Sequence, residues 1–414
     1  MSAGIRHDDL RKRNRALVIS AVRRAGQPSR TELARKTGLS HSTISAISAD
    51  LLAEGVLAEA RGGEAPALKR GRPQVAIGLN PEAAAVIAVV LALNSLTATL
   101  FDYSGKVIAE DHRRLQTLTI GRSELTAETT AIVCRLMRHS GAAGRRVLRI
   151  VMAVQGITDS AGREMLWSPI TAHGDIPFAD LLEEATGIPA TIENDCSMIV
   201  VALRWRDPER YRDDFIAILL SHGIGMGLML RGELFTGTHS SGGEFGHMIH
   251  QPEGALCRCG RRGCVEAYAG SYAIWRHVRQ GDDNAPPAAD INDVEMQMLA
   301  LAARQGEGVE RAAFRRAGRA IGYGLGNLFA LIDPAPVAVV GQGASAFDLI
   351  EPALREAIAQ TAGGQHSQSI TFATEPNEIP LIREGCVMRA LTFVDEELFA
   401  PGLTLQASAG KDVA

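Results

Sequence analysis

Residues 29–57 read SRTELARKTGLSHSTISAISADLLAEGVL, and this stretch predicts two short helices joined by a tight turn. Ser29 and Glu32 have the spacing of a capping box, in which a serine oxygen and a glutamate carboxylate satisfy free amides of the first helical turn. Gly38 can take the positive φ of the turn, and Ser40 can cap the next helix. Two short helices joined by a glycine-containing turn are the helix-turn-helix pattern.

The second of these helices would present short polar side chains at its exposed start, where they reach base edges in the major groove of DNA. Apolar residues at 39, 44, 47 and 51 would bury between the helices, beside an amphipathic helix expected over residues 9–24. The residues that we expect to contact DNA are Ser40, His41, Ser42, Thr43 and Ser45. The alternative is an ordinary three-helix bundle without DNA contact.

Two strands are expected after the second helix, over residues 56–59 and 74–77, where they would form a wing around a loop. The loop contains the basic stretch KRGRP at residues 69–73. Glycine and proline keep this stretch narrow and extended, so Arg70 and Arg72 are expected to enter an AT-rich minor groove, whose negative potential attracts arginine. A solvated basic linker is the alternative interpretation.

The charge of the chain is distributed unevenly. Residues 1–79 contain 14 Lys and Arg against 7 Asp and Glu, whereas the whole chain of 414 residues has a formal net charge of −4. A basic head therefore precedes an acidic body, as expected for a DNA-binding module attached to a domain that does not bind DNA. The length exceeds that of one compact core. We expect a winged helix-turn-helix over residues 1–79, a first α/β lobe over 80–190 and a second over 191–414, whose C-terminal helix can pack back on the first lobe.

The body alternates strand-like apolar runs with helix-like segments, which is typical of an α/β architecture. Strands are expected over residues 85–91, 96–101, 148–154, 215–220 and 337–340, and helices over 124–139, 178–186, 310–331 and 348–361. No internal repeat is evident. The chain has neither the roughly 20-residue apolar run of a membrane span nor the apolar segment of a secretory signal. We therefore expect a cytoplasmic protein without a membrane partner.

Three of the six cysteines lie within eight residues, in the stretch CRCGRRGC at 257–264. In a cytosolic chain such crowding indicates a metal site rather than disulfides. Cys257, Cys259 and Cys264 with one histidine would complete a tetrahedral Zn²⁺ shell with no open position, which is a structural site. His247 and His250 are both candidates for the fourth ligand.

Polar residues form a second group. Asn194 and Asp195 follow a strand-like segment, Glu244 and His247 follow a pair of glycines, and Glu266 lies just beyond the last cysteine of the metal motif. Carboxylates and amides at the ends of strands suit hydroxyl-rich ligands, because they form paired hydrogen bonds with vicinal hydroxyls. The pattern alone leaves open a sugar site on one side and capping or surface roles on the other.

These segments together resemble the ROK family (repressors, open reading frames, kinases), in particular its repressor branch. The likeness extends over nearly the whole chain and rests on TELARKTGLSHSTISAISADLLAEGVL, GRPQVAIGLN, IENDCS, HGIGMGLMLRGELFTG, SGGEFGH and CRCGRRGCVEAYAG. The resemblance implies a ribonuclease H-like, actin-type fold of two lobes with sugar bound in the cleft. It places sugar contacts at Asn194, Asp195, Glu244, His247 and Glu266, and zinc ligands at His247, Cys257, Cys259 and Cys264.

The sequence departs from the family's kinases where they bind phosphate. Those kinases carry a D-x-G-G-T-K motif on the first strand of the body, and here the corresponding residues 90–95 are VLALNS. Without the glycines the backbone cannot approach a phosphate, and without Asp and Lys nothing positions Mg²⁺. His222 also replaces a usual Thr. We therefore expect no enzyme, with Asp195 as the relic of the general base, now a hydrogen-bond acceptor for a sugar hydroxyl.

The joint interpretation is a transcriptional regulator, with repressor of sugar uptake or catabolism genes as the expected role. It would bind a palindromic double-stranded operator as a homodimer or homotetramer, since two-fold symmetry in the protein matches two-fold symmetry in the site. The effector would be a sugar or a sugar phosphate, and the cofactor structural Zn²⁺. The alternative is an active ATP-dependent sugar kinase with an attached DNA-binding domain.

Overall fold

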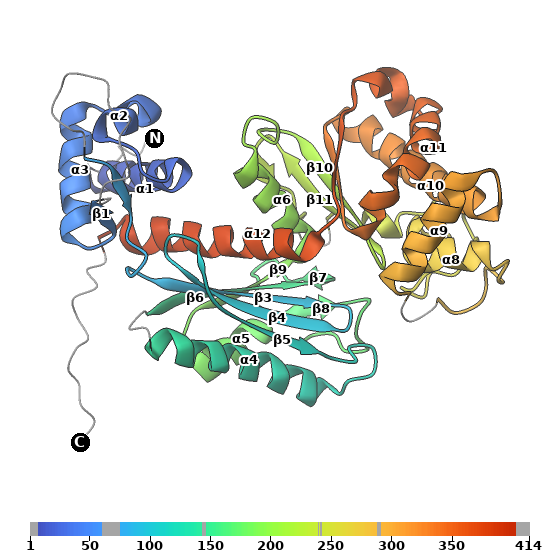
Figure 1. The fold of residues 1–414 in the computed structure, drawn as a ribbon, viewed down its shortest axis with the longest axis horizontal. Coiled ribbons are helices and arrows are strands. Elements are labelled where there is room, and N and C mark those ends of the chain that lie inside the picture. The colour runs from blue at the N-terminus through green and yellow to red at the C-terminus, as the bar shows by residue number, and fades with distance from the viewer. Residues whose placement is uncertain are drawn as a thin grey trace.

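The computed structural model describes residues 7–59, 75–142, 146–238, 240, 242–287 and 291–402. An N-terminal helical unit and two α/β lobes are joined by the long helix α12 (Glu378–Phe393), which runs across the centre of the molecule (Figure 1). None of the described helices is long and apolar enough to cross a bilayer.

The N-terminal unit consists of α1 (His7–Ala25), α2 (Arg30–Thr37) and α3 (His41–Ala53), followed by the antiparallel strands β1 (Leu57–Glu59) and β2 (Ile77–Leu79). The capping box at the start of α2 forms as predicted, and Gly38 ends the helix with φ 72°. The second wing strand begins later than predicted, because Ile77 is the apolar residue that is buried there and Val75 is exposed. Arg70 and Arg72 lie outside the described residues.

The first lobe is built on a five-stranded sheet of order β5-β4-β3-β6-β9. Helix α12 covers one face of the sheet, while α4 (Arg122–Ala142) and α5 (Phe178–Thr186) cover the other (Figure 1). Burial on both faces explains the unbroken apolar run of β3. The strands are β3 (Ala85–Ala92), β4 (Ser95–Asp102), β5 (Val107–Arg114), β6 (Val147–Val154) and β9 (Ala190–Asn194), with a small β7 (Ile157–Thr158) and β8 (Met165–Trp167) beside them.

The second lobe repeats this arrangement. Its sheet has the order β12-β11-β10-β13-β14, and in both sheets three antiparallel strands are followed by two parallel ones. This internal repeat, which was not evident in the sequence, resides in topology rather than in residue identity. The strands are β10 (Phe215–Leu220), β11 (Ile224–Leu230), β12 (Glu233–Leu234), β13 (Val337–Val340) and β14 (Phe372–Glu375).

Helices of the second lobe surround this sheet. Helix α6 (Asp195–Arg206) packs between β11 and α12, and the predicted boundary at 190/191 falls at the start of β9, a strand of the first sheet. The remaining helical segments are η1 (Phe245–His247), α7 (Glu266–Ala269), α8 (Ser271–Val278), α9 (Asp293–Gln305), α10 (Val309–Ile332), η2 (Gln342–Ala346), α11 (Phe347–Ala359) and η3 (Ala362–Ser369).

The C-terminal helix packs back on the first lobe, against β3 and β6. A π-helical turn, η4 (Val394–Phe399), continues α12 and contacts α1. There the Arg23 guanidinium donates two hydrogen bonds to Asp395, at 2.8 and 2.9 Å, and both side chains are about 95% buried. The Tyr103 hydroxyl of the first lobe also donates to Asp395. One buried carboxylate thus joins the N-terminal unit, α12 and the first lobe.

Candidate ligand cleft and metal centre

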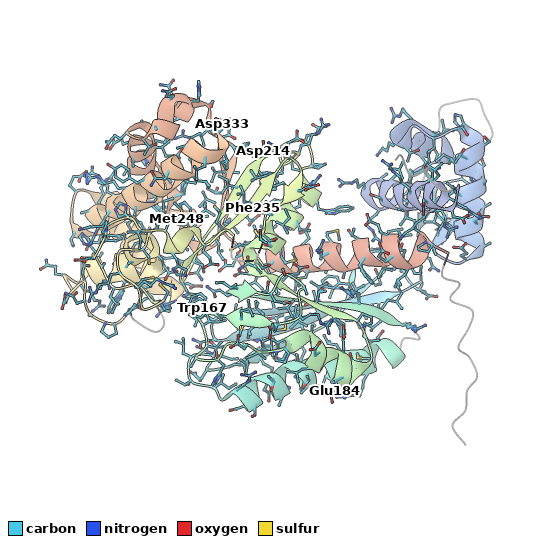
Figure 2. All side chains as sticks on the ribbon, turned by 180° about the vertical axis from the view of Figure 1, so that it is seen from behind. Trp167, Glu184, Asp214, Phe235, Met248 and Asp333 are labelled. Carbon is cyan, nitrogen blue, oxygen red and sulfur yellow. The ribbon has the colours of Figure 1, made fainter. Side chains whose placement is uncertain are left out.

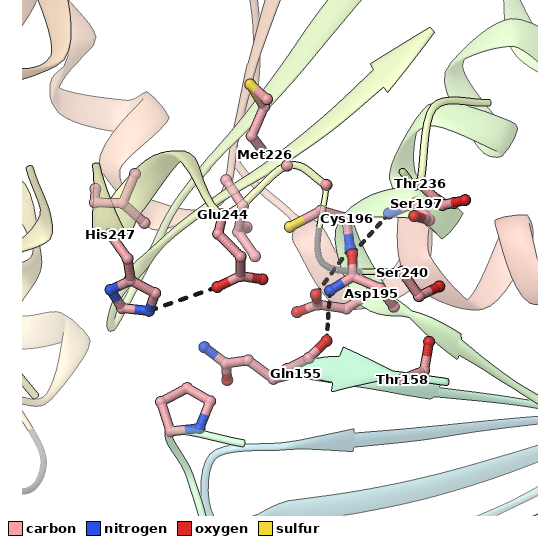
Figure 3. A pocket seen from close by; sticks show the side chains of 18 of the residues that line it. Gln155, Thr158, Asp195, Cys196, Ser197, Met226, Thr236, Ser240, Glu244 and His247 are labelled. Atoms are coloured by element: carbon pink, nitrogen blue, oxygen red, sulfur yellow. Dashed lines mark hydrogen bonds and ion pairs between the residues drawn. The ribbon is translucent and has the colours of Figure 1, made fainter. Parts of the chain in front are cut away.

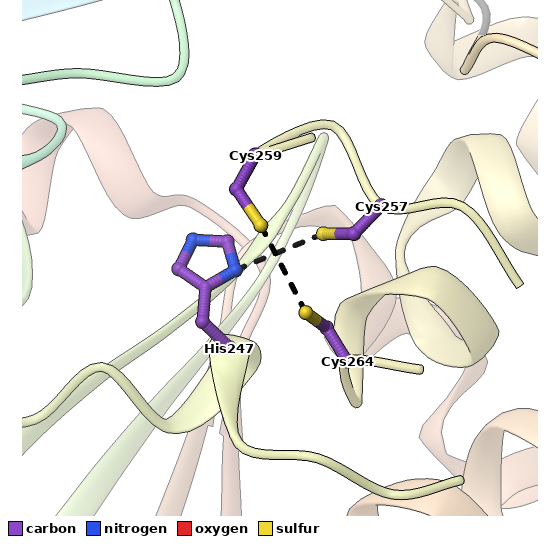
Figure 4. A group of neighbouring side chains, drawn as sticks. All are labelled: His247, Cys257, Cys259 and Cys264. Carbon is purple, nitrogen blue, oxygen red and sulfur yellow. Dashed lines mark hydrogen bonds between the residues drawn. The ribbon is translucent and has the colours of Figure 1, made fainter. Parts of the chain in front are cut away.

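The four predicted metal ligands converge on one point. The ligand atoms of His247, Cys257, Cys259 and Cys264 all lie within 4.8 Å of one another. His247 Nδ1 is 3.7 Å from Cys257 Sγ, and the sulfurs of Cys259 and Cys264 are 3.8 Å apart (Figure 4). A tetrahedron with Zn–S bonds of about 2.3 Å has edges of about 3.8 Å, so the side chains already have the spacing that zinc requires.

His250, the alternative fourth ligand, is turned away from this group. Its ring packs against Tyr268 with centroids 4.9 Å apart and stacks on Tyr323 at 5.8 Å. Hydrogen bonds from the neighbouring Cys257 and Cys264 thiols hold the pKa of Cys259 far below its usual value, which favours the thiolate form that metals bind. The residues present therefore suit a closed, four-coordinate metal site.

Glu266 connects the metal loop to the cleft between the lobes. Its buried carboxylate accepts a hydrogen bond from the Ile224 amide at 3.1 Å, and its other oxygen lies 3.5 Å from Cys257 Sγ. Gly223 is required beside it, because a Cβ there would come within 2.6 Å of the carboxylate. The metal loop thus determines where Glu266 and the turn between β10 and β11 lie.

The cleft contains all five of the predicted sugar contacts (Figure 3). Asn194 and Asp195 come from the start of α6, Glu244 and His247 from the η1 segment, and Glu266 from α7. Glu244 is 3.8 Å from His247 Nε2. Asn194 also has a structural role, because it caps α6 through the Ser197 amide and donates to the Gly156 carbonyl at 2.9 Å.

Sequence reasoning missed several lining residues that carry hydrogen-bonding or aromatic groups. Trp167 lies where the two lobes meet (Figure 2), with its ring edge-on to His247 at 5.7 Å. Short strands and loops carry all of these residues except Ser197, which lies in the first turn of α6, so no periodic pattern marks them. They are Gln155, Thr158, Trp167, Ser197, Thr236 and Ser240.

Asp195 is the most perturbed carboxyl group of the cleft. Burial raises its pKa from 3.8 to about 7, although a hydrogen bond from the Cys196 amide opposes the shift. Burial also raises the pKa of Glu244. Burial removes these carboxylates from water, and ligand hydroxyls can supply the hydrogen bonds that water no longer gives.

A second cavity adjoins the cleft and shares Gln155, Asp195 and Leu219 with it. Ala92, Leu93 and Ser95 line this cavity at the turn from β3 to β4, where the sequence departs from the kinase motif. Leu93 is buried in the core of the first lobe. The turn thus carries side chains at the positions where the kinase motif has glycines.

At the start of α3 the predicted DNA contacts divide into two kinds. The Ser40 hydroxyl caps the helix by accepting from the Thr43 amide at 3.1 Å, and it lies 2.8 Å from the hydroxyls of both Ser42 and Thr43. His41, Ser42 and Ser45 are exposed. The Ser40 cap therefore orders the first turns of α3, which carry these exposed side chains.

Comparisons with known proteins match most of the chain. A model described as the ROK family matches residues 86–379. The curated xylose repressor of Caldicellulosiruptor bescii is 24% identical over 360 residues, which cover 86% of this chain and 89% of that protein.

Solved structures show the same fold. A ROK family transcriptional regulator, described as a homolog of the E. coli MLC protein, superposes with a TM-score of 0.74 at 23% identity and covers 94% of this chain and 97% of its own. A ROK family glucokinase from Streptomyces griseus, in complex with glucose and AMPPNP, has a TM-score of 0.57 at 22% identity and covers 74% of this chain and 98% of its own. The predicted two-lobed, sugar-kinase type body is thereby confirmed.

Proposed function

This chain belongs to the ROK family, and on that premise we propose that it is a transcriptional repressor of sugar uptake or catabolism genes, controlled by a sugar bound between the lobes. The observation that carries the proposal is the difference in coverage. The regulator structure spans 94% of the chain, whereas the glucokinase structure spans 74%. The described residues that precede the segment matched by the family model include the three-helix unit with its paired wing strands.

DNA would be read by α3. Its exposed residues His41, Ser42 and Ser45 would face base edges, and the basic surface of the first 79 residues would neutralise phosphates. Arg70 and Arg72 remain proposed minor-groove contacts. A two-fold symmetric homodimer or homotetramer would place two such helices on a palindromic operator.

The sugar would bind to the buried carboxylates and amides of the cleft. Asp195, Glu244 and Glu266 accept hydroxyl hydrogen bonds, and Trp167 offers an apolar ring face at the junction of the lobes. Zn²⁺ held by His247 and the three cysteines has a structural role. When bound, it would fix the segment that leads into Glu266 at the start of α7, whose carboxylate accepts a hydrogen bond from the Ile224 amide at the β10–β11 turn, so the sugar site would depend on the metal.

We do not expect phosphate transfer, because residues 90–95 at the β3–β4 turn lack the Asp, Gly and Lys of the kinase phosphate motif. A general base contributes only when a phosphoryl donor is bound and oriented beside it. Leu93 and the other side chains at the β3–β4 turn line the place where the donor's phosphates would lie. The rival, an active sugar kinase, predicts magnesium-dependent release of ADP from ATP with some sugar, and we expect none.

Helix α12 supplies a route from the cleft to the DNA-binding unit. At its start Glu378 accepts a hydrogen bond from Ser221 of the second lobe at 2.8 Å, and further along Arg389 pairs with Glu193 of the cleft at 2.9 Å. Its continuation carries Asp395, which holds Arg23 of α1. Closure of the lobes would move α12 and with it α1, and the sugar would alter DNA affinity by its differential affinity for the two closure states.

The proposal is tested by affinity selection of fragmented genomic DNA with the purified, zinc-loaded protein. We expect enrichment of one palindromic site upstream of genes for sugar transport or catabolism. Release of the selected fragments by one sugar of a panel would then identify the effector. If no site is enriched by folded, zinc-loaded protein, the DNA-binding function is wrong and the kinase assay becomes the decisive one.

A further inference from the structure

The described lining of the cleft contains four carboxylates and neither lysine nor arginine. The acidic residues are Glu193, Asp195, Glu244 and Glu266. Glu193 pairs with the exposed Arg389 at 2.9 Å, and Glu244 lies 3.8 Å from His247 Nε2, a side chain that the metal site would use as a ligand. In the sequence, residues 235–246 read FTGTHSSGGEFG and also contain neither lysine nor arginine.

The described lining of the two neighbouring cavities likewise offers no unpaired lysine or arginine. The cavity that shares Asp195 with the cleft is lined by Glu378 and His222, and none of its described lining residues is lysine or arginine. In the cavity beyond it the described lining includes one arginine, Arg304. That guanidinium is already paired with Asp348 through hydrogen bonds of 2.6 and 2.9 Å.

Backbone amides that could replace a cationic side chain are occupied as well. The start of a helix binds anions through its free amides, but at the start of α6 the Cys196 amide donates to Asp195 and the Ser197 amide donates to Asn194. The Ile224 amide at the β10–β11 turn donates to Glu266. These donors are thus satisfied by the protein's own oxygens.

A phosphate monoester carries a charge of about −1.5 to −2 near pH 7. Proteins bind such groups through Arg, Lys or free backbone amides, and a phosphate held near buried carboxylates is repelled in a medium where charges are poorly screened. The carboxylates that repel an anion are well suited to accept hydrogen bonds from neutral hydroxyls.

We propose that the effector is an uncharged sugar, recognised through its hydroxyls, and that sugar phosphates are excluded by charge. The inference rests on the proposed function, since it names the chemical class that the same cleft takes. An uncharged effector means that the protein responds to the sugar before the sugar is phosphorylated.

Calorimetric titration of the full-length, zinc-loaded protein tests this inference. The probes are common aldopentoses, aldohexoses and 2-acetamido hexoses, each paired with its terminal phosphate. We expect at least one neutral sugar to bind and its phosphate to bind about 100-fold more weakly or worse. A terminal phosphate that binds as tightly as its parent sugar, or more tightly, overturns the inference and leaves the sugar-controlled regulator standing.

Methyl ethers at the same terminal hydroxyl separate charge from size. We expect the ether of the bound sugar to lose affinity by about tenfold, which is the smaller end of the change that one methyl group causes in a pocket, and therefore to bind more tightly than the phosphate. If the ether is excluded as strongly as the phosphate, steric closure rather than charge discriminates and the inference is wrong. If the protein selects DNA but binds neither the neutral nor the phosphorylated panel, the sugar-binding part of the proposed function fails too.

Discussion

Replacing Asp195 with Asn is predicted to stabilise the protein while destroying its response to sugar. Burial raises the pKa of Asp195 from 3.8 to about 7, so the folded state holds a proton that the unfolded chain has already released. Stability is therefore lost progressively as the pH rises from about 4 to about 7, because the unfolded state binds fewer protons over that range. Above pH 7 the buried, ionised carboxylate lowers the free energy of unfolding by about 4 kcal/mol. This value follows from a pKa shift of roughly three units at about 1.4 kcal/mol per unit.

Asparagine keeps the oxygen that accepts from the Cys196 amide at 2.8 Å and never ionises. We therefore expect Asp195→Asn to raise the free energy of unfolding by up to about 4 kcal/mol at pH 8 and by little at pH 4.5. Urea denaturation of both proteins at the two pH values measures the difference. The matched control is Glu209→Gln, an exposed carboxyl, which should change stability by less than about 0.5 kcal/mol at either pH.

No gain in stability from Asp195→Asn at pH 8, or an equal gain at both pH values, would show that the buried charge of Asp195 does not limit stability. A gain that does not depend on pH would come from packing and not from removal of a buried charge. In the same samples calorimetry should show that the variant loses sugar affinity, since an amide cannot accept as strongly as a carboxylate and presents N–H donors where an acceptor is required.

Three other changes test separate parts of the account. Replacing Cys257 and Cys259 with Ser should abolish zinc binding, measured by elemental analysis, and should also abolish the effect of sugar on DNA binding. If sugar still changes DNA binding normally in a variant without zinc, the metal has no part in the mechanism. Arg23→Met should lower the free energy of unfolding by about 3 kcal/mol, because Asp395 is left buried without its cation; urea curves that coincide with the wild type would contradict the role of this ion pair. Ser42→Ala should weaken operator binding by about 1 kcal/mol or more in gel-shift titrations, whereas Glu124→Gln, at an exposed position on α4, should not. Equal affinity of the wild type and both variants would move the DNA interface away from α3.

Much of the fold could be predicted from local signals. The capping box at Ser29 and the turn at Gly38 determine α2 and the start of α3 through hydrogen bonds between residues close in the chain. The buried strands β3, β6 and β10 were found because burial on both faces makes them continuous apolar runs. In contrast, β5 was missed, since this edge strand is largely exposed and polar. The repeated topology of the two sheets depends on pairing between distant segments and leaves no periodic trace.

Some residues of the candidate site could likewise be predicted from the sequence, and others could not. The three cysteines could be placed together because zinc requires a definite number and type of ligands, and the choice of His247 over His250 came from the family resemblance. Gln155 and Trp167 could not, because strands distant in the sequence carry them to the cleft. The Arg23–Asp395 pair joins the two ends of the chain, and neither residue has a neighbour in the sequence that indicates its partner. The connection between cleft and DNA-binding unit therefore became visible only in three dimensions.

Control of DNA binding by the sugar cleft is tested most directly by the affinity of the protein for its selected operator, measured by fluorescence anisotropy with and without the sugar that calorimetry identifies. We expect saturating sugar to change the operator Kd by about tenfold or more in the wild type and to leave it unchanged in Asp195→Asn. A sugar that binds the wild-type cleft tightly, yet leaves the operator Kd the same, would contradict control of DNA binding by this site.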